Sequence, residues 1–100
     1  MAVTLTVLYT VPDDPADFDR HYRDVHMPIV AKWQGVESVE LTRIDATMGG
    51  AERYHLMTQI RFPDRATLDA ALGSEAGAEA GRDFGSIAAP GSFMLIGETD

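Results

Sequence analysis

Residues 3–15, VTLTVLYTVPDDP, contain most of a predicted strand and the beginning of a predicted helix. From Val3 to Val11 the odd-numbered residues are apolar or aromatic, and the even-numbered residues are mostly threonine. This two-residue period, with its many β-branched side chains, predicts a strand. The Pro-Asp-Asp-Pro sequence ends the strand, because Asp14 suits the N-terminal cap of a helix and Pro15 suits its first position.

The helix that follows is predicted over roughly residues 15 to 32 by a stripe of apolar side chains. The members of this stripe recur every three or four residues and are Phe18, Tyr22, Val25, Ile29 and Trp33. Gly35 is a natural C-terminal stop. Pro28 lacks an N–H and clashes with the carbonyl group of Asp24, so we expect a kink or a new start beside His26.

The rest of the chain predicts strands at residues 36–44, 53–62 and 92–97, with a hairpin turn at Gly49-Gly50. A helix capped by Asp64 should turn Leu68, Ala71 and Leu72 inward, and after Gly73-Ser74 it should continue with Ala76, Ala80, Phe84 and Ile87. Gly77, Gly81 and Gly85 recur every four residues, which favours close helix packing. The order strand, helix, strand, strand, helix, strand predicts one domain over residues 1–100. Its class is α+β, a ferredoxin-like βαββαβ fold whose antiparallel four-stranded sheet carries the helices on one face.

Composition narrows the classes of partner. The net charge of −8 argues against nucleic acid and against anionic membranes. No apolar run approaches the ~20 residues of a membrane span. The absence of cysteine excludes disulfides, thiolate metal sites and a cysteine nucleophile. We therefore expect a cytoplasmic protein.

The sheet face without helices predicts a homodimer. The first strand should place Thr4, Thr6, Leu8 and Thr10 there, and the third His55, Met57, Gln59 and Arg61. The last strand, Phe93 to Ile96, is apolar on both faces, which a solvated sheet would not favour. We expect two sheet faces to meet across a twofold axis. The alternative is a monomer with a mildly apolar open face.

His26 is the strongest candidate for chemistry, because a partly buried imidazole can act as a general acid or base near neutral pH. Tyr22 lies one helical turn earlier and can touch it. Asp83 could orient the imidazole if the packing brings the two together. The alternatives are a histidine that only stabilises the helix break, and an Asp83 that is simply a surface acid.

Four aromatic residues are predicted to face the gap between helices and sheet and to contact a small apolar or aromatic ligand: Tyr9, Trp33, Tyr54 and Phe84. Core packing is the alternative, and it is favoured for Phe84. His21 lies about 140° around the helix from His26, so a shared metal is not expected, and it should join Arg20 and Asp24 on a solvated face. His55 should point to the open sheet face.

These residues resemble the EthD family. The resemblance runs from the strand ending in Tyr9 through Phe18-x-x-x-Tyr22-x-x-x-His26-Met27-Pro28-Ile29-Val30, then Tyr54 to Phe62, Asp64, Ala71-Leu72-Gly73-Ser74-Glu75 and Asp83-Phe84. It implies a dimeric α+β barrel. It also places the family's histidine, proline, tyrosine and Asp-Phe pair on His26, Pro28, Tyr22, Asp83 and Phe84. Trp33-Gln34-Gly35 stands where relatives often have Pro-Gly, so pocket size is not carried over.

The family's name comes from a gene cluster for ethyl tert-butyl ether degradation that includes a monooxygenase, and many members are named reductases. The resemblance thus implies an oxidoreductase or a protein close to one. Our leading hypothesis is a small-molecule-binding protein that performs proton transfer, isomerisation or cofactor-free oxidation, with no cofactor and no metal. The second is a non-catalytic accessory or binding protein for a catabolic oxygenase pathway. The third is haem binding at the dimer through His55 or His26.

Overall fold

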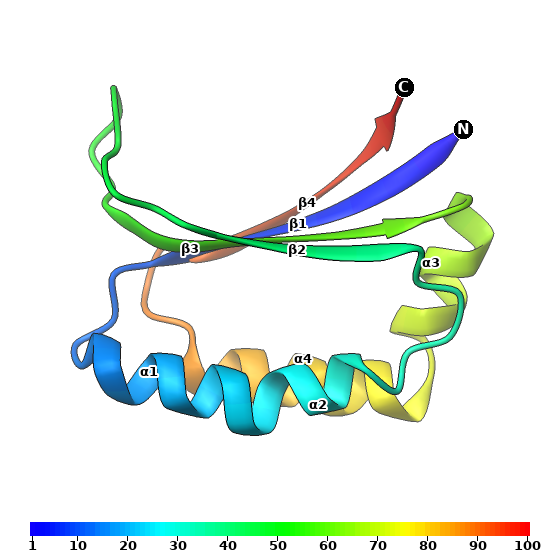
Figure 1. Cartoon of the computed structure of the whole chain (residues 1–100), viewed down its shortest axis with the longest axis horizontal. Coiled ribbons are helices and arrows are strands. Elements are labelled where there is room, and N and C mark those ends of the chain that lie inside the picture. The colour runs from blue at the N-terminus through cyan, green and yellow to red at the C-terminus, as the bar shows by residue number, and fades with distance from the viewer.

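One antiparallel sheet of four strands carries all the helices on one face (Figure 1). The computed structural model describes all 100 residues. The elements in chain order are β1 (Ala2–Thr10), α1 (Pro15–His21), the π-helix η1 (Tyr22–His26), α2 (Met27–Val30), β2 (Ser38–Arg43), β3 (Tyr54–Phe62), α3 (Arg65–Leu72), α4 (Glu75–Ile87) and β4 (Phe93–Thr99). The strand order β2-β3-β1-β4 confirms the predicted ferredoxin-like fold. No helix has the length and apolar character that crossing a membrane requires.

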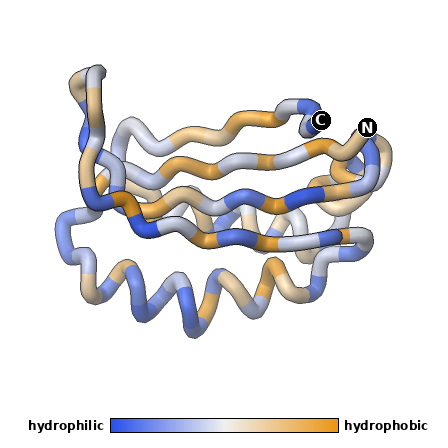
Figure 2. Tube along the Cα trace, turned by 45° about the horizontal axis from the view of Figure 1, so that its top comes forward, coloured by the Kyte–Doolittle hydropathy of each residue, from blue (hydrophilic) through white to orange (hydrophobic).

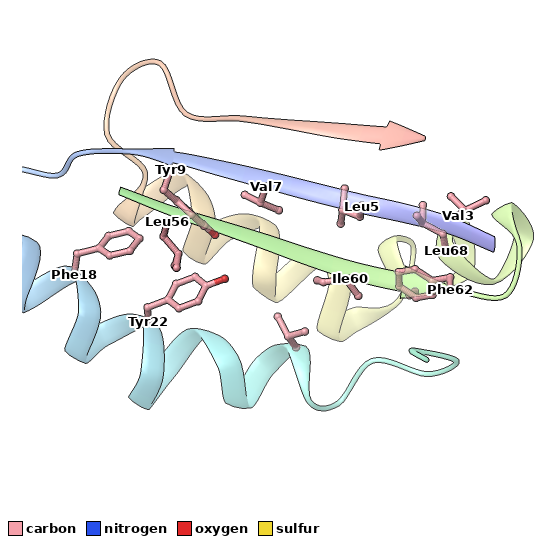
Figure 3. Close-up of a cluster of buried hydrophobic side chains, with 12 residues drawn as sticks. Val3, Leu5, Val7, Tyr9, Phe18, Tyr22, Leu56, Ile60, Phe62 and Leu68 are labelled. Carbon is pink, nitrogen blue, oxygen red and sulfur yellow. The ribbon is translucent and has the colours of Figure 1, made fainter. Parts of the chain in front are cut away.

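The core lies between sheet and helices. Figure 3 shows Tyr9 of β1 at the end of the core where Phe18 and Tyr22 lie, and Val3 at the opposite end near Phe62 and Leu68. Leu5 and Val7 lie between these ends. Phe62 and Leu68 have no exposed surface at all. The alternating pattern of β1 and β3 therefore predicts the core correctly. Two residues at the edge of the core were wrongly expected to be buried: Val11 is 47% exposed and Leu72 is 37% exposed.

The helix break expected at Pro28 takes the form of a widened turn. Tyr22 to His26 form a π-helix, and the N–H of Met27 donates to the carbonyl group of Tyr22, five residues earlier. A π-turn accommodates one extra residue, so it rotates the side chains that follow. Val25 is consequently 43% exposed and His26 only 6% exposed, which corrects the predicted apolar stripe.

A bulge near the start of β3 reverses two predicted orientations. Tyr9 pairs with Leu56, but Thr10 pairs with Tyr54, so His55 is the extra residue. Tyr54 consequently packs edge-to-face against Phe93 on the open side of the sheet. His55 instead turns to the helix side. The expectations that Tyr54 faces the helices and that His55 faces the open side were both wrong.

Close packing between α3 and α4 depends on Gly77. A β-carbon added there would lie 2.2 Å from the carbonyl oxygen of Ala71 and 2.5 Å from that of Leu72. A β-carbon at Gly81 or Gly85 would meet nothing within 4 Å. The predicted role of the glycine repeat in packing therefore holds only for its first member.

The edge strand β4 is apolar on both faces, as predicted (Figure 2). Its register with β1 places Phe93 and Leu95 on the open face of the sheet, and Met94 and Ile96 on the helix side. The exposed fractions of these four residues range from 36% to 54%. Strand β4 thus presents apolar surface in both directions.

Candidate functional site

The carboxylate of Asp83, on α4, joins two imidazoles of the first helix. Nδ1 of His26 lies 2.7 Å from Oδ2 of Asp83, and Nε2 of His21 lies 2.8 Å from Oδ1. The His26 side chain is 7% exposed and that of Asp83 12% exposed. The packing thus brings the predicted catalytic residues His26 and Asp83 together, and Asp83 is not a free surface acid.

His21 joins this cluster because the first helix is not straight. On a regular α-helix, residues five apart lie about 140° from each other. The π-helix Tyr22–His26 widens the turn that separates the two histidines, and both imidazoles reach the same carboxylate. Arg20 and Asp24 are exposed, as predicted for this face, but they pair with Asp17 and Arg23 and not with each other. His21 was wrongly assigned to that face, because its ring turns to Asp83.

The contact with Asp83 determines which nitrogen of His26 carries the proton in the neutral ring. An ionised carboxylate can only accept, so Nδ1–H donates and Nε2 keeps its lone pair. No side-chain or backbone group of the protein hydrogen-bonds to Nε2. The ring is also held in place by Tyr22, which stacks on it with 4.9 Å between ring centroids. His26 therefore presents a fixed, unpaired acceptor.

The ionised state of Asp83 is favoured by its two partners. Burial raises the pKa of this carboxyl group, but the hydrogen bonds from His21 and His26 outweigh burial, and the pKa lies below its ordinary value. Asp83 is thus a carboxylate at neutral pH. In that state it stabilises positive charge on the His26 ring.

We expect Asp83→Asn to lower the free energy of unfolding at pH 7 by about 1–3 kcal/mol, because two charge-assisted hydrogen bonds are lost. The pKa of Asp83 is lowered in the folded state, so its contribution to stability is fully present above the ordinary value of 3.8 and is lost as the pH falls through the lowered pKa. Urea unfolding of the wild-type protein and of Asp83→Asn at pH 7 and pH 3 measures the free energy of unfolding. The difference between the two proteins should be smaller at pH 3 than at pH 7. The exposed Asp13, as Asp13→Asn, is the control. A difference that persists unchanged at pH 3 would contradict the ion pairing.

Two phenols lie beside the imidazole. The hydroxyl groups of Tyr22 and Thr58 lie 2.5 Å apart in a buried hydrogen bond. Tyr9 packs edge-to-face against Tyr22 and is 1% exposed. Burial, followed by the nearby Tyr22, raises the pKa of Tyr9 far above its ordinary value, and burial also raises that of Tyr22. Both phenols are therefore neutral hydrogen-bonding groups rather than bases.

A cavity of about 60 Å³ lies between these groups and the rest of the helix layer. Five predicted site residues line it: Tyr9, Tyr22, His26, Trp33 and Phe84. Trp33 is held there by its indole N–H, which donates to the carbonyl group of Ala76 at 3.2 Å. Tyr54 is absent from the lining because of the bulge in β3. Asp83 supports the site from behind His26 and does not line the cavity.

The residues where this cavity opens to solvent were not predicted from the sequence. Most of its lining is buried, but Leu72, Gly81 and Met94 are exposed, so they form its mouth. Gly81 carried a signal, as the middle member of the glycine repeat. That signal pointed to packing and not to an opening. Thr58 was also missed, although it is the hydrogen-bonding partner of Tyr22.

A second histidine and carboxylate pair lies outside the cavity. Nε2 of His55 lies 2.7 Å from Oδ1 of Asp19, whose other oxygen accepts from Arg43. Burial raises the pKa of Asp19, but the bonds from His55 and Arg43 lower it below its ordinary value. His55 is thus turned away from the open face, where haem binding at a dimer would have needed it. No group of three or more His, Asp or Glu side chains is arranged to hold a metal ion.

The fold and the site define a class of protein: a ferredoxin-like domain that holds a carboxylate-bound imidazole beside a small apolar cavity. Residues 12–90 match the EthD domain. The chain belongs to the EthD family. It is 30% identical over 92 residues, 92% of this chain and 89% of the relative, to an uncharacterized 11.0 kDa protein from the thcB-thcC intergenic region of Rhodococcus erythropolis.

Solved structures agree on the fold. An EthD family protein from Bacillus halodurans superposes with a TM-score of 0.90 and 31% identity, over the full length of both chains. SnoaB, a cofactor-independent oxygenase from Streptomyces nogalater, gives a TM-score of 0.74 at 15% identity over 98% of this chain and 92% of its own. A dimeric protein of unknown function from Bacteroides fragilis gives 0.68 at 14% identity over 98% and 96%.

Proposed function

We propose that the cavity beside His26 binds a small apolar or aromatic metabolite, and that Nε2 of His26 accepts a proton from it. The observation that carries this proposal is the hydrogen bond from Nδ1 to Asp83, which leaves Nε2 without a partner on a histidine that lines a mostly apolar cavity. Apolar walls with a few convergent polar groups are typical of small-molecule sites. The imidazolium that forms is stabilised by the carboxylate of Asp83.

Two outcomes of proton removal suit this site. In an isomerisation, the proton moves from one carbon or oxygen atom of the metabolite to His26 and returns to another atom, so no co-reactant is needed. With dioxygen as co-reactant, the anion of the metabolite is oxidised and dioxygen takes up its electrons. The likeness in fold to SnoaB, a cofactor-independent oxygenase, supports the second outcome.

Deuterium exchange tests the proposed base. The probe is 2-indanone, a compact aromatic ketone with acidic hydrogens on carbon, incubated with the protein in D₂O. We expect deuterium to enter the ketone faster than in buffer, and the ring signals of His26 to shift on titration in an NMR spectrum. Shifts without faster exchange would leave a binding protein and reject the catalytic base. Exchange without any effect on His26 would place the chemistry elsewhere.

We also propose a homodimer through the open sheet face, supported by the exposed apolar side chains of Phe93 and Leu95 there. Light scattering after size-exclusion chromatography should give twice the chain mass. Leu95→Lys should shift the protein to a monomer, because it buries a charge in the contact. The neighbouring Ile96, on the opposite face, provides the control Ile96→Lys. A monomeric wild-type protein would reject the proposal.

A further inference from the structure

We propose that Gly81 determines which molecules the cavity accepts. In this view the ligand is neutral, donates one hydrogen bond to Nε2 of His26, and extends its apolar body over Gly81 between Leu72 and Met94. This inference rests on the proposed function, because it concerns the same cavity. It adds the orientation of the ligand, its chemical class and the residue that limits its size.

The volume of the cavity requires part of any ring to lie in the mouth. The cavity measures about 60 Å³, and one water takes up about 30 Å³ in the liquid. Benzene has been held in an engineered protein cavity of about 150 Å³. A six-membered ring therefore cannot be enclosed here. Its polar end can reach His26 only if its body occupies the opening.

The mouth has the shape and chemistry to hold that body. Leu72 and Met94 are exposed apolar side chains, although both line the cavity. Gly81 also belongs to the lining and is exposed, and a β-carbon there would meet no atom within 4 Å. The space beside this position is therefore free in the native protein. A large residue at position 81 would fill the space that the ligand needs.

The charges around the site favour a neutral ligand that donates a hydrogen bond. Nε2 of His26 is an acceptor in the neutral ring, and a ligand that brings neither an O–H or N–H donor nor an acidic C–H group to it would leave it unpaired. The carboxylate of Asp83 lies directly behind this ring, and the chain carries a net charge of −8, so an anion is repelled. A phenol or a comparable neutral hydroxyl compound meets all these conditions.

Three probes and two variants test the inference by NMR titration of the His26 ring signals. We expect phenol to bind the wild-type protein, and anisole and benzoate to bind about tenfold more weakly or not at all, because one lacks the donor and the other is charged. Gly81→Leu should weaken phenol binding at least about tenfold. Gly85→Leu is the matched control, one turn along the same helix, equally open and outside the cavity lining.

Each result decides between the two proposals. Equal phenol affinity in the wild-type protein and Gly81→Leu would overturn the role of Gly81 and leave the proposed function standing. An equal loss of phenol affinity in Gly81→Leu and Gly85→Leu would show a general effect on the helix, and it would also overturn the role of Gly81. Equal affinity for phenol and anisole, or no response of His26 to phenol, would overturn the ligand class. The exchange of 2-indanone still judges the proposed function in that case, since it does not depend on phenol.

Discussion

Gly77→Ala is expected to destabilise the fold by about 3 kcal/mol or more, because the new methyl group has no space. Its position would lie 2.2 Å and 2.5 Å from two carbonyl oxygens at the end of α3. These are backbone atoms, so relief requires α3 and α4 to move apart. That movement disturbs Leu68 and Ala71, which are buried in the core. Thermal unfolding should show a midpoint lower by roughly 12–24 °C for a domain of this size.

The same substitution at Gly85 is the control for this prediction. Gly85 lies inside the same helix, is exposed, and has open space where the methyl group would go. Alanine is the better helix former, so Gly85→Ala should raise stability by up to about 1 kcal/mol. A loss of stability in Gly77→Ala together with a gain in Gly85→Ala would confirm that packing, and not helix propensity, requires glycine at position 77. A neutral Gly77→Ala would show that the two helices pack less closely than described.

His26→Gln is expected to slow deuterium exchange of 2-indanone by about 100-fold or more, since a positioned general base contributes about 10²–10⁴-fold. Glutamine approximates the size of the ring and can still hydrogen-bond to Asp83, but its amide does not take up a proton near neutral pH. The initial rate of deuterium incorporation, measured by mass spectrometry at a fixed protein concentration, gives the ratio. Circular dichroism and thermal unfolding check that the variant remains folded.

His55→Gln is the matched control for the base. His55 also hydrogen-bonds a carboxylate at 2.7 Å, but it does not line the cavity. Its replacement should leave the exchange rate close to that of the wild-type protein. Equal slowing in both variants would indicate a general effect of losing a histidine and carboxylate pair. An unchanged rate in His26→Gln would remove His26 from the proposed chemistry.

Much of the site could be predicted because the residues that form it follow local rules. The period of two in β1 directs Tyr9 inward, and the stripe on the first helix directs Tyr22 inward. Pro28 marked the helix break next to His26. Asp83 was expected near His26 only as one alternative, since its distance along the chain gives no geometric constraint.

The errors have specific physical causes. One extra residue in the π-turn exchanged Val25 for His26 on the buried face and brought His21 to the same carboxylate as His26. One extra residue in β3 sent Tyr54 to the open face. Such insertions shift every side chain near them, because helix and strand faces depend on an unbroken period. Neither insertion has a reliable signature in local composition.

Local sequence patterns were enough to predict the order of the elements, the faces of β1, the two helix caps at Asp14 and Asp64, and the place where the first helix is disrupted. These depend on neighbouring residues and on the backbone limits of proline and glycine. The three-dimensional packing was required to establish that two histidines share Asp83, that Gly77 is needed for close packing while Gly81 lines the cavity, and which side of the sheet Tyr54 occupies. These depend on contacts between segments far apart in the chain, where a shift of one residue changes which side chains meet.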